Sequence, residues 1–145
     1  MKAVIQRVTQ ASVDVEGARV AQIGRGALVL VGILDGDDEA RARALAERVG
    51  RLRYFPDDQG RMNLSLDQVG GELLVVSQFT LAADGRRGRR PSFDQALEAS
   101  LAEPLYECFV EALEALGVPC SRGVFGAQMA VELLNDGPVT FVLES

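Results

Sequence analysis

The run Ala27-Leu28-Val29-Leu30-Val31-Gly32-Ile33-Leu34 is aliphatic almost throughout and is the clearest indication of the fold. Strands that are covered on both faces show such continuous apolar runs, whereas half-buried strands alternate. The run is about half as long as a membrane-spanning segment would need to be. We therefore expect a central strand of a soluble domain, with other elements packed on both of its faces.

Two strands are expected before this run. Residues 4–15 alternate apolar and polar side chains toward their end, Glu16-Gly17 is typical of a turn, and residues 18–23 form the returning strand. Arg7 lies in the middle of the first strand. A charge there is more often paired or at a sheet edge, but it could also hold a loop in place.

Helices are expected in separate blocks after the run. Gly36-Asp37-Asp38 predicts a helix start, because acidic side chains favour the positive end of a helix. Ser92-Phe93-Asp94-Gln95 has the capping-box spacing and predicts a second, short helix. A third is expected over residues 104–116, which carry an apolar stripe and end at Gly117.

Further strands are expected at residues 72–81, 128–134 and 139–144, and a turn at residues 56–60. Strand-rich segments with helices in separate blocks indicate an α+β fold. We expect a single domain spanning residues 1–145. Its sheet should be mostly antiparallel and barrel-like, with two or three helices packed on one face.

Composition excludes several classes of function. Of the 145 residues, 48% are hydrophobic and none is histidine, so disorder is excluded and no histidine base, His-containing triad or imidazole metal site exists within the chain. We expect no metal and no cofactor. The two cysteines, Cys108 and Cys120, predict reduced core thiols and, with a polar N-terminal stretch, a cytoplasmic protein. A net charge of −6 argues against broad nonspecific binding of nucleic acids.

The run Ser77-Gln78-Phe79-Thr80-Leu81 places polar side chains where a very apolar strand ends. They could simply cap the strand. Alternatively, Ser77 or Thr80 is a nucleophile, or the main-chain N–H groups around Phe79 and Thr80 bind an oxyanion. A hydroxyl nucleophile needs a base that this chain does not offer, so electrostatic stabilisation is the better of the two catalytic interpretations.

Two further segments admit a structural and a functional interpretation. One is the arginine loop, Gly85-Arg86-Arg87-Gly88-Arg89-Arg90-Pro91. It is either a solvated loop or a phosphate clamp, since guanidinium groups match phosphate oxygens. Asn135-Asp136-Gly137-Pro138 is either an ordinary turn or a segment of unusual backbone geometry, because a glycine before proline has no Cβ to restrict it.

Taken together, five segments resemble the D-aminoacyl-tRNA deacylase family over the full length of the chain, and three of them, in this order and at these separations, are highly specific. The segments are Ile5-Gln6-Arg7-Val8, Met62-Asn63-Leu64, Ser77-Gln78-Phe79-Thr80-Leu81, Arg90-Pro91-Ser92-Phe93 and Asn135-Asp136-Gly137-Pro138-Val139-Thr140.

The resemblance implies hydrolysis of the ester of D-aminoacyl-tRNA, and of glycyl-tRNA, by a homodimer with active sites at the subunit interface. It implies that Ser77, Gln78, Phe79 and Thr80 surround the scissile ester. It also implies a cis Gly137-Pro138 bond that reaches into the partner's site, where its carbonyls meet the substrate's amino group, and that Arg7 braces this segment. We expect Arg86, Arg87, Arg89 and Arg90 to contact tRNA.

Two other functions remain open from sequence. One is a nucleic-acid-binding protein without turnover, in which the arginine loop is the functional part and the strand end is merely structural. The other is an esterase for small D-amino-acid esters. Release of free amino acid from D-tyrosyl-tRNA separates the first from a deacylase, and a requirement for the tRNA body separates the second.

Overall fold

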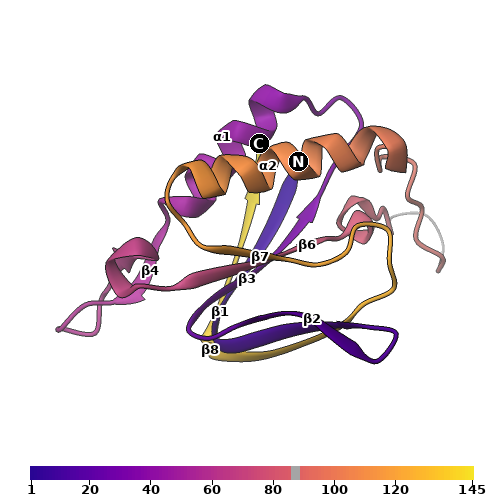
Figure 1. Ribbon diagram of the computed structural model, residues 1–145. Coiled ribbons are helices and arrows are strands. Elements are labelled where there is room, and N and C mark those ends of the chain that lie inside the picture. Colours follow the sequence, from indigo (N-terminus) through magenta and orange to yellow (C-terminus); the bar gives the residue numbers. More distant parts are fainter. Residues whose placement is uncertain (86–88) are drawn as a thin grey trace.

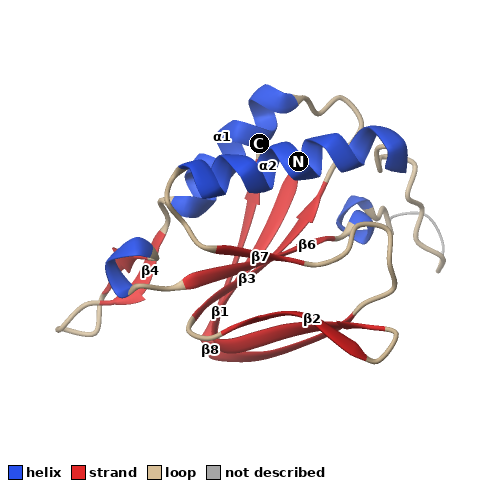
Figure 2. Cartoon of the chain, in the orientation of Figure 1, coloured by secondary structure: helices blue, strands red, loops and turns tan. Residues whose placement is uncertain are grey.

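The computed structural model describes residues 1–85 and 89–145. Two α-helices lie on one side of a strongly curved sheet (Figures 1 and 2). In chain order, the elements are β1 (Lys2–Val15), β2 (Ala18–Ile23), β3 (Gly26–Gly32), α1 (Glu39–Gly50), β4 (Arg53–Pro56), β5 (Met62–Ser65), the 3₁₀ turn η1 (Asp67–Val69), β6 (Glu72–Ser77), the 3₁₀ turn η2 (Phe79–Ala82), α2 (Ala99–Ala115), β7 (Cys120–Arg122) and β8 (Ala130–Glu144).

The main sheet is mixed and curls into a nearly closed barrel. Its order is β2-β1-β3-β6-β7, and β8 pairs along the other edge of β1. The long strand β1 is antiparallel to β2, β3 and β8. The β3–β6 and β6–β7 ladders are parallel. The fold is therefore the expected single-domain α+β barrel-like sheet with helices on one face, and a parallel β3–β6–β7 portion lies within it.

The predicted two-sided burial of β3 is confirmed. Ala27, Val29 and Val31 face the larger core beneath the two helices. Leu28 belongs to a second core on the opposite face, together with residues of β1, β2 and β6. Successive side chains of a strand point to opposite faces, so an unbroken aliphatic run is what a strand between two cores requires.

The first half of the chain follows the sequence expectation closely. Strands occur at Lys2–Val15 and Ala18–Ile23, and the helix predicted after Gly36 is α1. Asp38 caps α1 by accepting a hydrogen bond from the Arg41 N–H at 2.8 Å. Two short strands, β4 and β5, flank the predicted turn at residues 56–60 and were not expected.

The prediction of a helix starting at Ser92 is wrong. Both main-chain groups of Ser92 bond to Asp84, at 2.9 and 2.8 Å, and this bridge holds the residue extended. Its hydroxyl accepts from the Asp94 N–H at 3.3 Å within a turn. Helix α2 begins later, at Ala99, after the Glu98 side chain accepts from the Ser100 N–H at 3.3 Å. It therefore starts five residues before the predicted boundary, with Pro104 inside it.

Two strand predictions also need correction. The strand expected over residues 72–81 ends at Ser77, because the chain turns into η2. The two strands expected at 128–134 and 139–144 form the single strand β8, which runs beside β1 on both sides of the Asn135–Pro138 segment. That segment is therefore an interruption within one strand and not a turn between two.

Candidate active site

Two main-chain donors follow the end of β6. The Gln78 N–H donates to the Val31 carbonyl at 2.8 Å and extends the parallel ladder by one residue. The chain then turns into η2, and within residues 1–85 and 89–145 the N–H groups of Phe79 and Thr80 bond to no acceptor. The first N–H groups of a helical turn lack partners within that turn. Two adjacent donors of this kind form a site for a carbonyl oxygen or an anion.

A glycine allows η2 to lie this close to β3. A Cβ on Gly32 would stand 2.9 Å from the Cβ of Leu81 and 3.0 Å from the Gln78 carbonyl oxygen. Any other residue at position 32 would push η2, and with it the two free donors, away from the sheet. Gly32 lies within the aliphatic run, where the local sequence indicates no particular function for it. Its function follows only from its close contact with Gln78 and Leu81, which are distant in the sequence.

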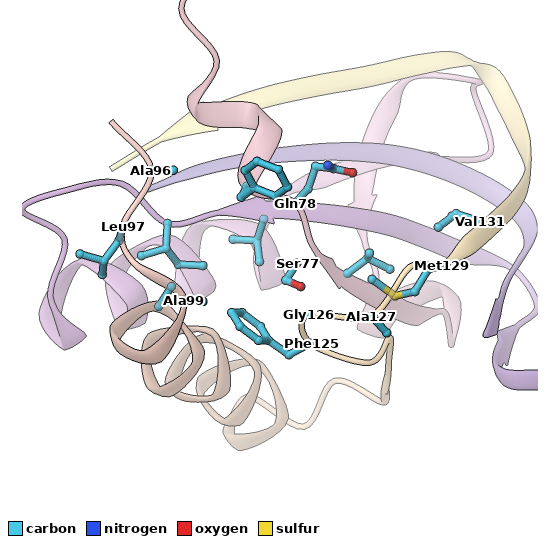
Figure 3. A pocket seen from close by; sticks show the side chains of 15 residues that line it. Ser77, Gln78, Ala96, Leu97, Ala99, Phe125, Gly126, Ala127, Met129 and Val131 are labelled. Atoms are coloured by element: carbon cyan, nitrogen blue, oxygen red, sulfur yellow. The ribbon is translucent and has the colours of Figure 1, made fainter. Parts of the chain in front are cut away.

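A pocket of about 480 Å³ lies beside this strand end and is lined mainly by apolar side chains. Ser77 occupies its middle, between Gln78 on one side and Phe125 on the other (Figure 3). The lining residues come from β3 and the residue after it, the end of β6 and the residues after it, the segment that leads into α2 and its first turn, the segment before β8 and the start of β8. They are Val31, Ile33, Val76, Ser77, Gln78, Phe79, Ala96, Leu97, Ala99, Ala102, Phe125, Gly126, Ala127, Met129 and Val131.

The side chains at the strand end include no nucleophile paired with a base. The Thr80 hydroxyl accepts a hydrogen bond from the Gln78 side-chain amide at 2.5 Å, and an amide cannot act as a general base at neutral pH. The Phe79 ring is 59% exposed and meets the Phe93 ring edge-on, with 5.1 Å between the ring centroids. The exposed Phe79 ring and the half-buried Phe93 ring form an aromatic surface next to the donors.

Arg7 connects three segments of the chain. The residue is only 9% exposed, and its Nε donates to the Asp136 carbonyl at 2.9 Å. One terminal nitrogen donates to the Tyr54 carbonyl at 2.7 Å, which ties β4 to β1. The Asp136 carboxylate also lies 3.2 Å from Nε. The charge that seemed out of place in a strand is thus bonded to the residue directly before Gly137.

The Gly137–Pro138 peptide bond is cis, as the resemblance implied. Both residues are exposed, and neither lines the pocket at Ser77. Strand β8 packs along β1 and touches α1, whereas η2 packs against β3. One chain therefore brings Ser77, Gln78, Phe79 and Thr80 together at the strand end, and Arg7, Gly137 and Pro138 together elsewhere, but does not join the two groups.

The arginine loop is described only in part. Arg86 and Arg87 lie outside the described residues. Arg89 and Arg90 are exposed.

Neither cysteine lines the pocket at Ser77. Burial raises the pKa of the Cys120 thiol to about 12 and also raises the pKa of the Cys108 thiol. Raised thiol pKa values agree with their interpretation as packing residues.

Neither a metal centre nor a membrane span is found in the described parts of the chain. Within residues 1–85 and 89–145, no three or more Cys, Asp or Glu side chains are grouped so that they could hold a metal ion. None of the helices in the same residues is long and apolar enough to cross a membrane.

Fold and site together are those of a single-domain α+β protein whose candidate site is built from main-chain groups. Residues 4–144 match the family model described as D-Tyr-tRNA(Tyr) deacylase. The D-aminoacyl-tRNA deacylase of Pelobacter propionicus is 58% identical over 144 residues, covering 99% of both chains. That of Roseiflexus castenholzii is 57% identical over 145 residues, covering all of this chain and 92% of the relative. This chain belongs to the D-aminoacyl-tRNA deacylase family.

Two solved structures are similar to the chain over nearly its whole length. One, described as c-Myc DNA Unwinding Element Binding Protein, has a TM-score of 0.94 and 42% identity and covers 100% of this chain and 99% of its own. The other, described as a probable eukaryotic D-amino acid tRNA deacylase, has a TM-score of 0.83 at 20% identity, with 98% and 97% covered. At 20% identity, the similarity to the second structure shows a shared fold only.

Proposed function

We propose that this protein hydrolyses the ester bond between a D-amino acid and the 3′-terminal ribose of tRNA, and so removes D-amino acids before translation can use them. Family membership supports the reaction class. The observation that carries the mechanism is the pair of N–H groups of Phe79 and Thr80, which bond to no acceptor in the described part of the chain and lie beside an apolar pocket. These are the donors that a developing oxyanion needs.

The chemistry fits a chain without histidine. An aminoacyl ester is already activated, so orientation and oxyanion stabilisation can be enough. Water adds to the ester carbonyl, and the negative charge on the carbonyl oxygen is held by the two N–H groups. The tetrahedral intermediate then expels the ribose 3′-oxygen. The neighbouring 2′-hydroxyl relays the proton from the attacking water to that oxygen, and the products are the free amino acid and tRNA.

Selectivity for the D-enantiomer would come from a second copy of the chain. In a homodimer, the exposed Gly137–Pro138 segment of one subunit would enter the pocket of the other, with its carbonyls holding the substrate's amino group. With the amino group and the ester both fixed, an L-side chain points into the wall and a D-side chain into open space. Glycine has no side chain to exclude, so glycyl-tRNA would also be hydrolysed.

Two features of β8 support the homodimer. This strand pairs only with β1 among the described strands, so its other edge is open within one chain. Leu134 and Val142, both on β8, are 57% and 63% exposed. An open strand edge with large apolar side chains is a surface that a second copy would cover. Analytical ultracentrifugation should therefore show a dimer.

Binding of the tRNA body would fall to the arginine loop, because the protein as a whole carries a net charge of −6. Arg89 and Arg90 are exposed, and with Arg86 and Arg87 they would contact tRNA phosphates. Replacing both Arg89 and Arg90 with alanine should lower the slope of log affinity against log salt concentration by about two at most. An unchanged slope with full-length tRNA would show that the loop does not contact phosphates.

A protein acting on tRNA would work in the cytoplasm.

The decisive experiment measures release of free amino acid from D-tyrosyl-tRNA, L-tyrosyl-tRNA and glycyl-tRNA by the purified protein. The proposal expects turnover of the first and third and no turnover of the second. Equal rates on the D- and L-esters would contradict stereoselection. Turnover of small D-tyrosyl esters that is as efficient as that of the tRNA substrate would favour the small-ester esterase.

Nucleic-acid binding without turnover is the second candidate, and one comparison favours it. The solved structure that is 42% identical is described as a DNA-binding protein. The same assay separates the two functions, since a pure binding protein would retain D-tyrosyl-tRNA without releasing amino acid.

A further inference from the structure

The β1–β8 ladder is irregular at two neighbouring places, between Gln6 and Val8 and between Val8 and Gln10, and the first of them contains the Gly137–Pro138 segment. Gln6 pairs with Thr140 and Val8 pairs with Asn135, so the single residue Arg7 stands opposite residues 136–139. Four residues opposite one cannot continue a regular ladder. The main-chain groups around the gap therefore need other hydrogen-bond partners if they are to stay fixed.

The Asn135 side chain supplies those partners. Its amide nitrogen donates to the Arg7 carbonyl at 2.9 Å and to the Val139 carbonyl at 3.1 Å. Its amide oxygen accepts from the Val139 N–H at 3.2 Å. One side-chain amide thus replaces a peptide group in the interrupted ladder. It bonds to β1 on one side and, on the other, to the residue that follows Pro138.

We propose that Asn135 is a positioning residue for the deacylation reaction, holding the Gly137–Pro138 segment at a fixed distance from β1. This inference rests on the proposed function, in which the carbonyls of that segment hold the substrate's amino group. Arg7 secures the segment before Gly137 through the Asp136 carbonyl, and Asn135 secures it after Pro138 through Val139. Together they fix both ends.

Both halves of the amide are needed, which makes the position sensitive to a nearly isosteric change. An aspartate has the same shape as asparagine, but it places an oxygen where the nitrogen faces two carbonyl oxygens. The donor bonds to Arg7 and Val139 would become repulsive contacts. An alanine would leave the Arg7 carbonyl and both main-chain groups of Val139 without these partners, but it would add no repulsion.

The experiment compares Asn135→Asp and Asn135→Ala with the control Gln22→Glu. Gln22 lies on the exposed surface of β2, and its side-chain oxygen accepts from Arg19 at 3.2 Å. The control therefore also changes an amide to a carboxylate, but at an exposed position beside a cation. The kcat and KM for D-tyrosyl-tRNA and the rate on L-tyrosyl-tRNA are measured for each variant. Hydrogen exchange of the Val139 N–H and thermal unfolding are followed on the same samples.

Asn135→Asp should lower kcat/KM for D-tyrosyl-tRNA by about tenfold to a hundredfold and reduce the ratio of D- to L-ester hydrolysis, because a misplacement of about 1 Å can cost this much. The kcat/KM of Asn135→Ala should lie between those of Asn135→Asp and the wild type, and the kcat/KM of Gln22→Glu should match that of the wild type. Exchange at Val139 should be at least about tenfold faster in both Asn135 variants, as expected for a lost hydrogen bond.

Two results would overturn the inference. One is a folded Asn135→Asp or Asn135→Ala protein with wild-type exchange at Val139. The other is faster exchange with an unchanged D-to-L ratio and unchanged kcat/KM, which would make Asn135 purely structural. If the wild type itself releases no amino acid, the proposed function fails, and exchange at Val139 alone then decides whether Asn135 fixes the segment.

Discussion

Two regions of this molecule, residues 77–80 and residues 135–139, both lie where a strand is broken, but they treat the break in opposite ways. At the end of β6, the N–H groups of Phe79 and Thr80 bond to no acceptor in the described chain. In β8, the side chain of Asn135 and that of Arg7, which comes from β1, bond to the main chain on both sides of Gly137–Pro138. The first region offers main-chain groups to a ligand, and the second holds main-chain groups still.

The difference shows how a site can be built with few reactive side chains. Free donors need only a chain that stays in place, which the Gly32 contact and the Gln78 ladder bond provide. An exposed segment needs active bracing, because exposed backbone otherwise moves. Changes in the braced region should therefore have large effects, and removal of side chains from the donor region should have small ones.

The largest effect is expected for Gly137→Ala. The added Cβ would lie 2.1 Å from the Val139 nitrogen and 2.9 Å from a Val139 methyl carbon, so the braced segment must shift. Deacylation of D-tyrosyl-tRNA should fall about 100-fold or more, the size that a displacement near 1 Å can cause. Rates measured with limiting and with saturating D-tyrosyl-tRNA give kcat/KM and kcat and check this.

Gly24→Ala is the matched control, because its Cβ would meet only a Glu72 carboxylate oxygen at 3.8 Å. It should keep wild-type activity. Wild-type activity in Gly137→Ala as well would mean that the braced segment does not take part in the reaction.

Arg7→Met tests the bracing itself through stability. Methionine fills a similar volume but leaves the Asp136 and Tyr54 carbonyls without their charged donor. The free energy of unfolding should fall by about 2–4 kcal/mol, since hydrogen bonds to charged groups are worth about 1.5–3 kcal/mol each and the buried Tyr54 carbonyl is left unpaired. Urea unfolding measures the loss, and D-tyrosyl-tRNA deacylation should fall with it.

Arg43→Met provides the comparison for this loss. Arg43 lies on the exposed side of α1 and pairs with Glu39 one turn away at 3.3 Å. Exposed pairs of this kind contribute about 0.3–0.5 kcal/mol. An equal loss of stability in the two variants would contradict the bracing function of Arg7.

How much of these two regions the sequence could predict depends on whether their contacts are local or join residues far apart in the chain. Strands β1, β2 and β3 and helix α1 follow from local periodicity and capping, and they were predicted. The helix at Ser92 was not correctly predicted, because the bridge to Asp84 overrides the capping-box pattern. The polar residues after the apolar run indicated a strand end within residues 77–81, but the strand was expected to continue to residue 81 and it ends at Ser77.

The bracing contacts were beyond local sequence reasoning. Asn135 and Arg7 are 128 positions apart, and Arg7 and Tyr54 are 47 apart. The sequence showed a charge in an odd position but not its partners. The cis Gly137–Pro138 bond was expected from the resemblance and not from the local sequence, which by itself favoured an ordinary turn with a trans bond.

A smaller effect, of opposite sign, is expected for Tyr54→Phe. Only the main-chain carbonyl of Tyr54 contributes to the bracing. Its hydroxyl is buried, bonds to no partner in the described residues, and has a pKa raised by burial. Removing a buried, unpaired hydroxyl should leave stability unchanged or raise it by up to about 1 kcal/mol.

Tyr106→Phe is the matched control, measured by the same urea unfolding. The Tyr106 hydroxyl is also buried but donates to the Val75 carbonyl at 3.0 Å. Its removal should cost about 1 kcal/mol. A loss in Tyr54→Phe as large as in Tyr106→Phe would reveal a partner for the Tyr54 hydroxyl, and the bracing of β4 would then involve more than its main chain.

The smallest effect is expected for Thr80→Ala, and it bears directly on the donor region. The substitution removes a hydroxyl that accepts from the Gln78 side chain, but it keeps the Thr80 N–H. Loss of one oxyanion donor costs about 2.7–4 kcal/mol, so a variant that retains the donor should stay within about threefold of wild type in single-turnover hydrolysis of D-tyrosyl-tRNA. Ser77→Ala should behave in the same way. If either hydroxyl were instead a nucleophile, its removal would cost several orders of magnitude, and intact-mass analysis of the quenched wild-type reaction would show the protein carrying one aminoacyl group. Such an adduct would contradict the main-chain mechanism and would make the strand end a conventional nucleophilic site.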